Sequence, residues 1–130
     1  MGKTALGDLQ HAIMQILWDK GEATVNDVHR KLLPVRGLAL TTVATMLRKM
    51  ETKGIVAHRI EGRQFVYSPT VTQDKVKRSM VRELVDRLFD GDPAALVTHL
   101  VEDREIDPDE LKDIASELAT AERRDKRDDE

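Results

Sequence analysis

The pattern of apolar positions predicts three helices in the first half of the chain. Apolar side chains recur there every three or four residues, the spacing that places them on one face of a helix. The predicted helices cover residues 8–20, 25–33 and 41–53. Pro34 is expected to end the second helix, because proline lacks the backbone N–H that a helix interior uses.

The next two apolar runs have the composition of strands. Residues 55–60 and 64–68 are rich in β-branched and aromatic side chains, and Glu61-Gly62-Arg63 between them suits a turn. These runs predict a β-hairpin with Arg59 and Arg63 at or near its tip. The expected fold class is therefore mainly α with a small β-hairpin.

A different kind of sequence follows Pro69. Thr72 suits the cap of a helix over 73–90, and Asp92-Pro93 and Asp107-Pro108 each resemble the start of a shorter helix. After residue 120 almost every residue is charged, which predicts disorder. We therefore expect a first domain at 1–70, a helical region at 71–120 and a tail at 121–130.

The C-terminal helices carry too few large apolar side chains for a secure core of their own. Burial against a second copy of the chain would supply the missing core. The candidates for core and dimer contacts are Leu84, Leu88, Leu96, Leu100, Leu111, Ile114 and Leu118.

The third predicted helix has an unusual polar face. Opposite its apolar stripe lie Thr41, Thr45, Arg48 and Thr52, flanked by Ala44 and Lys49. A face that only meets water usually carries Glu and Lys pairs, whereas threonine is a poor helix former. This short, acid-free face is interpreted as a contact surface.

Charge is unevenly distributed along the chain. The formal net charge is -3, but residues 1–68 carry +4 and residues 69–130 carry -7. The basic residues of the hairpin and of the third helix could face a polyanion.

Three helices, a tight turn and a hairpin occur in the order of a winged helix-turn-helix, whose third helix enters the DNA major groove. Threonine hydroxyls can bond phosphates or base edges, and Arg or Lys can bond guanine. Arg59 and Arg63 are expected to hold phosphates. The alternative is a helical protein-interaction adaptor that keeps the fold without specific DNA binding, its threonine-rich face packing on a protein.

The sequence does not support an enzyme, a cofactor or a metal site. It has no cysteine, no phosphate-binding loop and no zinc-protease or serine-hydrolase motif, and its four histidines lie on different predicted elements. No apolar run approaches the ~18 residues of a membrane span. We therefore expect a cytoplasmic protein that does not bind the membrane directly.

Two long stretches, LGDLQHAIMQILWDKGEATVNDVH and LTTVATMLRKMETKGIVAHRIEGRQFVYSP, resemble the penicillinase repressor family. That family includes the β-lactamase and methicillin-resistance repressors, and the likeness covers about residues 5–118. The resemblance implies a homodimeric repressor on a palindromic operator, controlling β-lactamase or other resistance and stress genes. Its N-terminal winged helices would bind two half-sites, and its C-terminal helices would interlock.

The resemblance also assigns individual residues. The family's recognition-helix contacts fall on Thr41, Thr42, Ala44, Thr45 and Lys49, with Arg48 beside them. Thr42 and Thr45 match the family, whereas staphylococcal members have Lys and Arg in place of Thr41 and Ala44.

The resemblance further implies a mode of release. Family members are inactivated when a membrane sensor-protease triggers cleavage at an Asn-Phe bond, which aligns with His99 and Leu100 here. Both residues differ from the family pattern. Copper-responsive relatives instead bind metal through C-x-C motifs, which a chain without cysteine cannot do.

Overall fold

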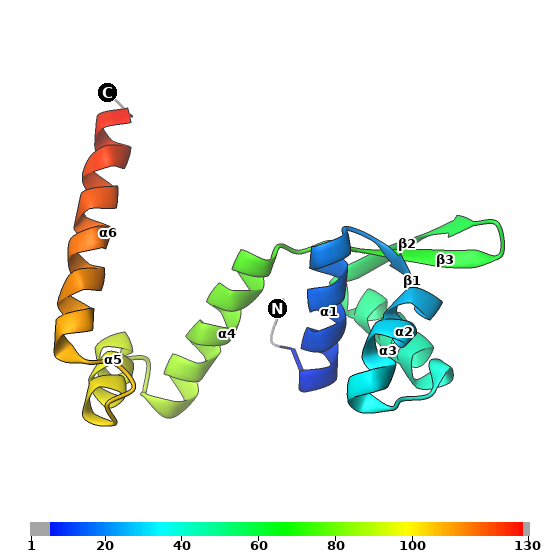
Figure 1. Cartoon of the computed structure of the whole chain (residues 1–130), viewed down its shortest axis with the longest axis horizontal. Coiled ribbons are helices and arrows are strands. Elements are labelled where there is room, and N and C mark those ends of the chain that lie inside the picture. The colour runs from blue at the N-terminus through cyan, green and yellow to red at the C-terminus, as the bar shows by residue number, and fades with distance from the viewer. Residues whose placement is uncertain (1–5, 129–130) are drawn as a thin grey trace. The chain divides into compact units, whose positions relative to one another are not determined.

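The computed structural model describes residues 6–128. Its elements, in chain order, are α1 (Asp8–Lys20), β1 (Ala23–Thr24), α2 (Val25–Arg36), α3 (Leu40–Lys53), β2 (Val56–Glu61), β3 (Gln64–Pro69), α4 (Gln73–Leu88), α5 (Pro93–Glu102) and α6 (Pro108–Asp128) (Figure 1). The described residues divide into two compact units, one ending at Glu83 and the other beginning at Leu84. The division falls within α4 rather than after residue 70.

The first unit has an apolar core to which α1, α2, α3 and the sheet contribute. The predicted apolar stripes of α1 and α3 are confirmed, since each supplies three buried side chains. Burial of this many aliphatic side chains is the main force that holds the unit together. The core residues are Ile13, Met14, Leu17, Ala23, Val28, Leu32, Val43, Leu47, Met50, Ile55, Val56 and Tyr67.

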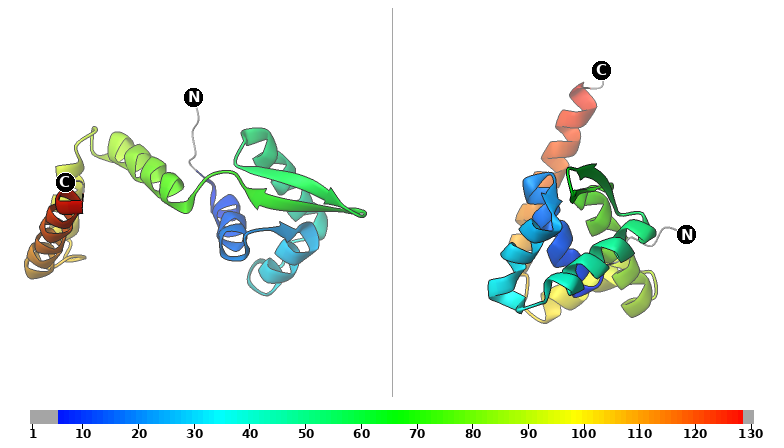
Figure 2. Two further views of the ribbon diagram at one scale, coloured as in Figure 1. Left: turned by 90° about the horizontal axis from the view of Figure 1, so that it is seen from above. Right: turned by 90° about the vertical axis from the view of Figure 1, so that its right-hand side faces the viewer.

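The sheet has three antiparallel strands in the order β1-β3-β2, one more than the sequence predicted. β1 is only two residues long, pairing Ala23 with Tyr67 and Thr24 with Val66. Such a short strand shows no alternating pattern, so sequence periodicity cannot reveal it. The β2–β3 hairpin is confirmed, and it projects past the helices of its own unit (Figures 1 and 2).

The N-terminus of α2 is fixed by the predicted capping box. The N–H of Asp27 donates to Thr24 Oγ1 at 3.1 Å, and the N–H of Thr24 donates to Asp27 Oδ2 at 3.1 Å. The predicted end of α2 was wrong, because the helix continues through Pro34 to Arg36. A proline in the last turn costs a single backbone hydrogen bond, so the helix can end three residues later than predicted.

The segment after the sheet is held against α1 of the same unit. Trp18 Nε1 donates to the carbonyl oxygen of Val71 at 3.0 Å. Thr72 caps α4 as predicted, its Oγ1 accepting from the N–H of Lys75 at 3.1 Å. Val76, one turn into α4, is only 1% exposed.

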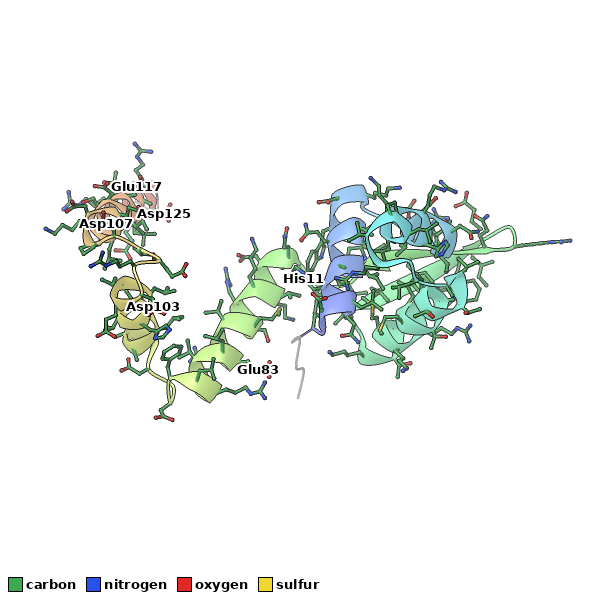
Figure 3. The ribbon with its side chains drawn as sticks, turned by 60° about the horizontal axis from the view of Figure 1, so that its bottom comes forward. His11, Glu83, Asp103, Asp107, Glu117 and Asp125 are labelled. Atoms are coloured by element: carbon green, nitrogen blue, oxygen red, sulfur yellow. The ribbon has the colours of Figure 1, made fainter. Side chains whose placement is uncertain are left out.

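The second unit consists of the end of α4 followed by α5 and α6. Asp92 caps α5, accepting from the N–H of Ala94 at 3.0 Å. No side chain between residues 93 and 125 is buried. Acidic side chains of the connection between α5 and α6 and of α6 itself are exposed, as Asp103, Asp107, Glu117 and Asp125 illustrate (Figure 3).

The prediction of disorder after residue 120 was wrong for the described part of the tail. α6 continues to Asp128, while residues 129 and 130 lie outside the described range. Glu, Arg, Lys and Ala are good helix formers, so a charged tail can extend a helix that is already nucleated. Among the described helices, none combines the length and apolar character needed to cross a membrane.

Candidate nucleic-acid interface

The two faces of α3 separate as the sequence predicted. Val43, Leu47 and Met50 are fully buried in the core of the first unit. The polar side chains that were predicted to contact a partner lie on the opposite face of the helix and are exposed to solvent. Ala44 is half-buried there, and the exposed members of this face are Thr41, Thr42, Thr45, Arg48 and Lys49.

The turn between α2 and α3 is fixed by local contacts. Gly37 ends α2 in the left-handed conformation, φ 58°, and its N–H donates to the Leu33 carbonyl oxygen at 3.0 Å. His29 Nε2 hydrogen-bonds to the carbonyl oxygen of Leu38 at 2.8 Å. These bonds hold the two helices in a helix-turn-helix arrangement.

A groove of about 550 Å³ separates α3 from the hairpin. It is cationic, since Arg48 comes from α3, Arg63 comes from the hairpin turn, and none of its lining residues is acidic. The rest of its lining is uncharged. These other residues are Thr24, Val25, Asn26, Leu40, Thr41, Ala44, Gln64, Phe65 and Tyr67.

The two arginines predicted to hold phosphates lie in different places. Ile60 pairs with Phe65, and Phe65 lines the groove, so this row of the hairpin faces α3. Arg59 is the neighbour of Ile60 on β2 and pairs with Val66, so it lies on the opposite face. Arg63 lines the groove and Arg59 does not.

Arg59 is held by two carboxylates. Its Nη2 lies 2.9 Å from Glu22 Oε1, and its Nη1 lies 2.5 Å from Glu61 Oε2. These hydrogen bonds, the one to Glu22 foremost, raise the pKa of the guanidinium above its ordinary value. Glu22 precedes Arg59 by 37 residues, so no local sequence pattern indicated this contact.

A second contact links α3 to the hairpin. His58 Nδ1 lies 2.5 Å and 2.8 Å from the two carboxylate oxygens of Glu51, and its ring stacks on Phe65 with centroids 4.1 Å apart. Tyr67 is buried beside them, and this burial raises the pKa of its hydroxyl. Sequence reasoning treated His58 as one of four scattered histidines and missed its role in connecting α3 to β2.

The predicted dimer residues of the second unit are all at least partly exposed. Leu88 is 71% exposed and Leu118 is 62% exposed, with Leu84 at 40% and Ile114 at 44%. Leu96, Leu100 and Leu111 are half-buried. The set therefore does not form a closed core within one chain.

The residues aligned with the family's cleavage site lie inside a helix. His99 and Leu100 belong to α5, and His99 Nε2 lies 3.2 Å from Asp103 Oδ2. Cleavage between them would require α5 to unwind locally. No group of three or more metal-ligating side chains occurs within the described residues.

The element order, the exposed third helix and the groove beside the hairpin define a winged helix-turn-helix protein. The model of the penicillinase repressor family matches residues 6–120, and the chain belongs to this family. The sequence-based prediction of a DNA-binding transcriptional repressor that is not an enzyme is thereby confirmed.

Individual relatives agree with this assignment. The chain is 38% identical over 101 residues to the transcriptional regulator BlaI of Mycobacterium tuberculosis, covering 76% of this chain and 73% of that one. It is 23% identical to the penicillinase repressor of Bacillus licheniformis, covering 84% and 85%. The solved DNA-binding domain of the repressor BlaI is 28% identical, with a TM-score of 0.50, and covers 55% of this chain and 87% of that one.

Proposed function

We propose that the chain binds a dyad-symmetric operator as a homodimer, with α3 of each subunit in a major groove. The observation that carries this proposal is the cationic groove between the acid-free face of α3 and the hairpin. The groove lies between the helix that would enter the major groove and the hairpin that would serve as the wing. Occupation of such an operator blocks transcription from an overlapping promoter.

The proposal gives the side chains of α3 distinct tasks. Thr42 and Thr45 read base edges in the major groove, and Lys49 bonds guanine or phosphate, with Thr41, Ala44 and Arg48 beside them. The short side chains let the helix backbone approach the floor of the groove closely. Arg63 neutralises a phosphate from the opposite wall of the groove.

The homodimer is supported by the apolar surface of the second unit. Nothing in residues 93–125 is buried, although Ile114 and Leu118 are large apolar side chains. A helical unit without a core of its own is not stable alone, and a second copy of the same helices offers a self-complementary cover. Two linked winged helices would then meet two half-sites of a palindrome.

The regulated genes and the releasing signal belong to the same proposal. The proposed targets are β-lactamase or other resistance and stress genes, and the name of the Bacillus licheniformis relative, penicillinase repressor, supports the first of these. Release through a membrane sensor-protease is the family-based proposal, and in this chain it would act on a bond inside α5. The cytoplasm is the proposed location, since bacterial operator DNA lies there.

Selection of bound fragments tests this function. Purified full-length protein is mixed with sheared DNA from its source genome, and the bound fragments are sequenced. We expect enrichment of a dyad-symmetric site that Thr45→Ala and Lys49→Ala reduce, while Lys77→Ala, at an exposed lysine of α4, does not. Weak recovery without sequence preference would overturn the operator and favour the adaptor.

A further inference from the structure

Arg59 and Arg63 belong to the same hairpin, yet their electrostatic surroundings differ. Arg63 lines the groove, whereas Arg59 lies on the opposite face between Glu22 and Glu61. Two carboxylates against one guanidinium leave that cluster with a net negative charge. A phosphate approaching Arg59 would be a third anion there, so the cluster disfavours DNA contact.

The contact of Arg59 with Glu22 joins separate parts of the first unit, whereas Glu61 lies on the same strand as Arg59. Glu22 lies in the connection between α1 and β1, and Glu61 lies at the end of β2. Each carboxylate accepts from a different nitrogen of the planar guanidinium, a geometry that fixes direction as well as distance. Arg59 therefore ties the middle of β2 to the body of the unit.

The hairpin needs this side-chain contact because only two of its residues pair with the third strand of the sheet. β1 pairs with β3 only at Val66 and Tyr67. Beyond Val66, toward the turn, no third strand pairs with the hairpin, and side-chain contacts such as those of His58 with Glu51 and of Arg59 with Glu22 hold it to the unit. An isolated two-stranded hairpin is marginally stable at best in water.

We propose that Arg59 is a positioning residue and not a phosphate ligand. Its ion pair with Glu22 fixes the angle of the hairpin, while Glu61 on the same strand holds the guanidinium in place. The fixed hairpin in turn keeps Arg63 and Phe65 at the wall of the groove. This inference rests on the proposed DNA binding by that groove. It replaces the sequence-based expectation that Arg59 and Arg63 both bind phosphates.

Hydrogen exchange of the full-length chain without DNA tests the tie by itself. Arg59→Gln and Glu22→Gln are each expected to speed amide exchange over residues 56–69, while Arg63→Gln and the α4 variant Arg82→Gln are not. Exposed ion pairs contribute little to global stability, so exchange in the buried helices should stay unchanged. Unchanged exchange of the hairpin in Arg59→Gln would overturn the proposal.

Salt titration on the selected operator separates positioning from phosphate binding. Arg59→Gln should weaken binding about two- to fivefold per wing, the range of an exposed ion pair, without changing the slope of log K against log salt. Arg63→Gln should lower that slope by about 0.9 for each phosphate that is no longer neutralised. A lower slope in Arg59→Gln would overturn the proposal.

Glu22→Gln gives the sharpest contrast, because the two roles predict opposite signs. If Arg59 positions the hairpin, losing Glu22 weakens DNA binding as Arg59→Gln does. If Arg59 binds phosphate, removing a competing carboxylate tightens binding. Should the wild-type chain bind no specific DNA, the proposed function fails, and hydrogen exchange alone decides the role of Arg59.

Discussion

Thr45 lies near the middle of the exposed face of α3 and has both a methyl group and a hydroxyl group to offer to bases. We expect Thr45→Ala to change the preferred base at one position of each half-site, costing about 1 kcal/mol on the best sequence. The salt slope should not change, because no charge is removed. Binding selection followed by salt titration measures both effects.

The matched control for Thr45 is on the same helix. Thr52 is exposed, but its hydroxyl already donates to the carbonyl oxygen of Arg48 at 3.1 Å. Thr52→Ala should therefore leave the base preference intact. The same change of preference in both variants would mean that helix stability, not base contact, was measured.

Arg63 is the hairpin cation that lines the groove. Arg63→Gln should weaken binding to all sequences alike, because a phosphate contact carries no base information. The effect should shrink as salt rises, with the slope reduced by about 0.9 for each phosphate that Arg63 neutralises. Arg82→Gln removes an equal charge from α4 and should change neither the affinity for DNA nor the salt slope. If both variants weakened binding equally, the loss of net charge alone would explain the result.

The sequence could predict which residues of α3 are exposed, but not what the charged hairpin residues contact. The separation of Val43 from Thr45 follows from helical periodicity, which depends only on nearby positions. The contacts of Arg59 and His58 depend on where the chain brings Glu22 and Glu51 after folding. A count of basic residues therefore overestimated the cations available to DNA.

At the scale of elements, the capping box of α2 has a pH dependence that can be worked out. The N–H of Thr24 foremost, and its hydroxyl next, lower the pKa of Asp27 from its ordinary 3.8. A lowered pKa means that the ionised carboxylate stabilises the fold above the unfolded pKa, and that this stability is lost as pH falls through the folded pKa.

Asp27→Asn should therefore cost about 0.5 kcal/mol of unfolding free energy at neutral pH. The difference from wild type should vanish in acid, below the lowered pKa of Asp27. Urea unfolding at a series of pH values measures it. Asp19→Asn is the control, at an exposed acid of α1, and a pH-independent difference for Asp27→Asn would contradict the ionic explanation.

Elements were predictable where one local signal was strong. α1 has the predicted bounds, and Asp92-Pro93 starts α5 as expected. Predictions failed where the structure of a segment depended on tertiary contacts or on helical turns already formed next to it. β1 exists because β3 lies beside it, and α2 and α6 continue past a proline and a charged run once the preceding turns are formed.

At the scale of the whole molecule, the part of the chain proposed to bind DNA and the part proposed to form the dimer carry opposite net charges. Residues 1–68 carry a net +4 and residues 69–130 a net -7. The basic part contains the groove, and the acidic part contains the helices proposed to pair with a second copy. Acidic exposed faces repel DNA, so DNA is directed to the winged helix.

The proposed dimer makes the stability of the chain depend on its concentration. Leu88 and Leu118 are 71% and 62% exposed in one chain, and burial of a leucine contributes about 1.5–3 kcal/mol. We expect the wild-type Tm to rise with protein concentration, and light scattering to give twice the chain mass of 14.7 kDa. A Tm independent of concentration together with a monomer mass would contradict the dimer.

Leu88→Glu should dissociate the dimer, because a glutamate buried at an apolar interface without a partner costs far more than leucine contributes. Val35→Glu places the same charge on an 82% exposed apolar residue of α2 and should leave the mass unchanged. The monomeric variant should keep its affinity for a single half-site but lose the tight binding of the full palindrome, since linkage raises the effective concentration of the second winged helix. Equal affinity of both variants for the palindrome would show that the second unit does not couple the two half-sites.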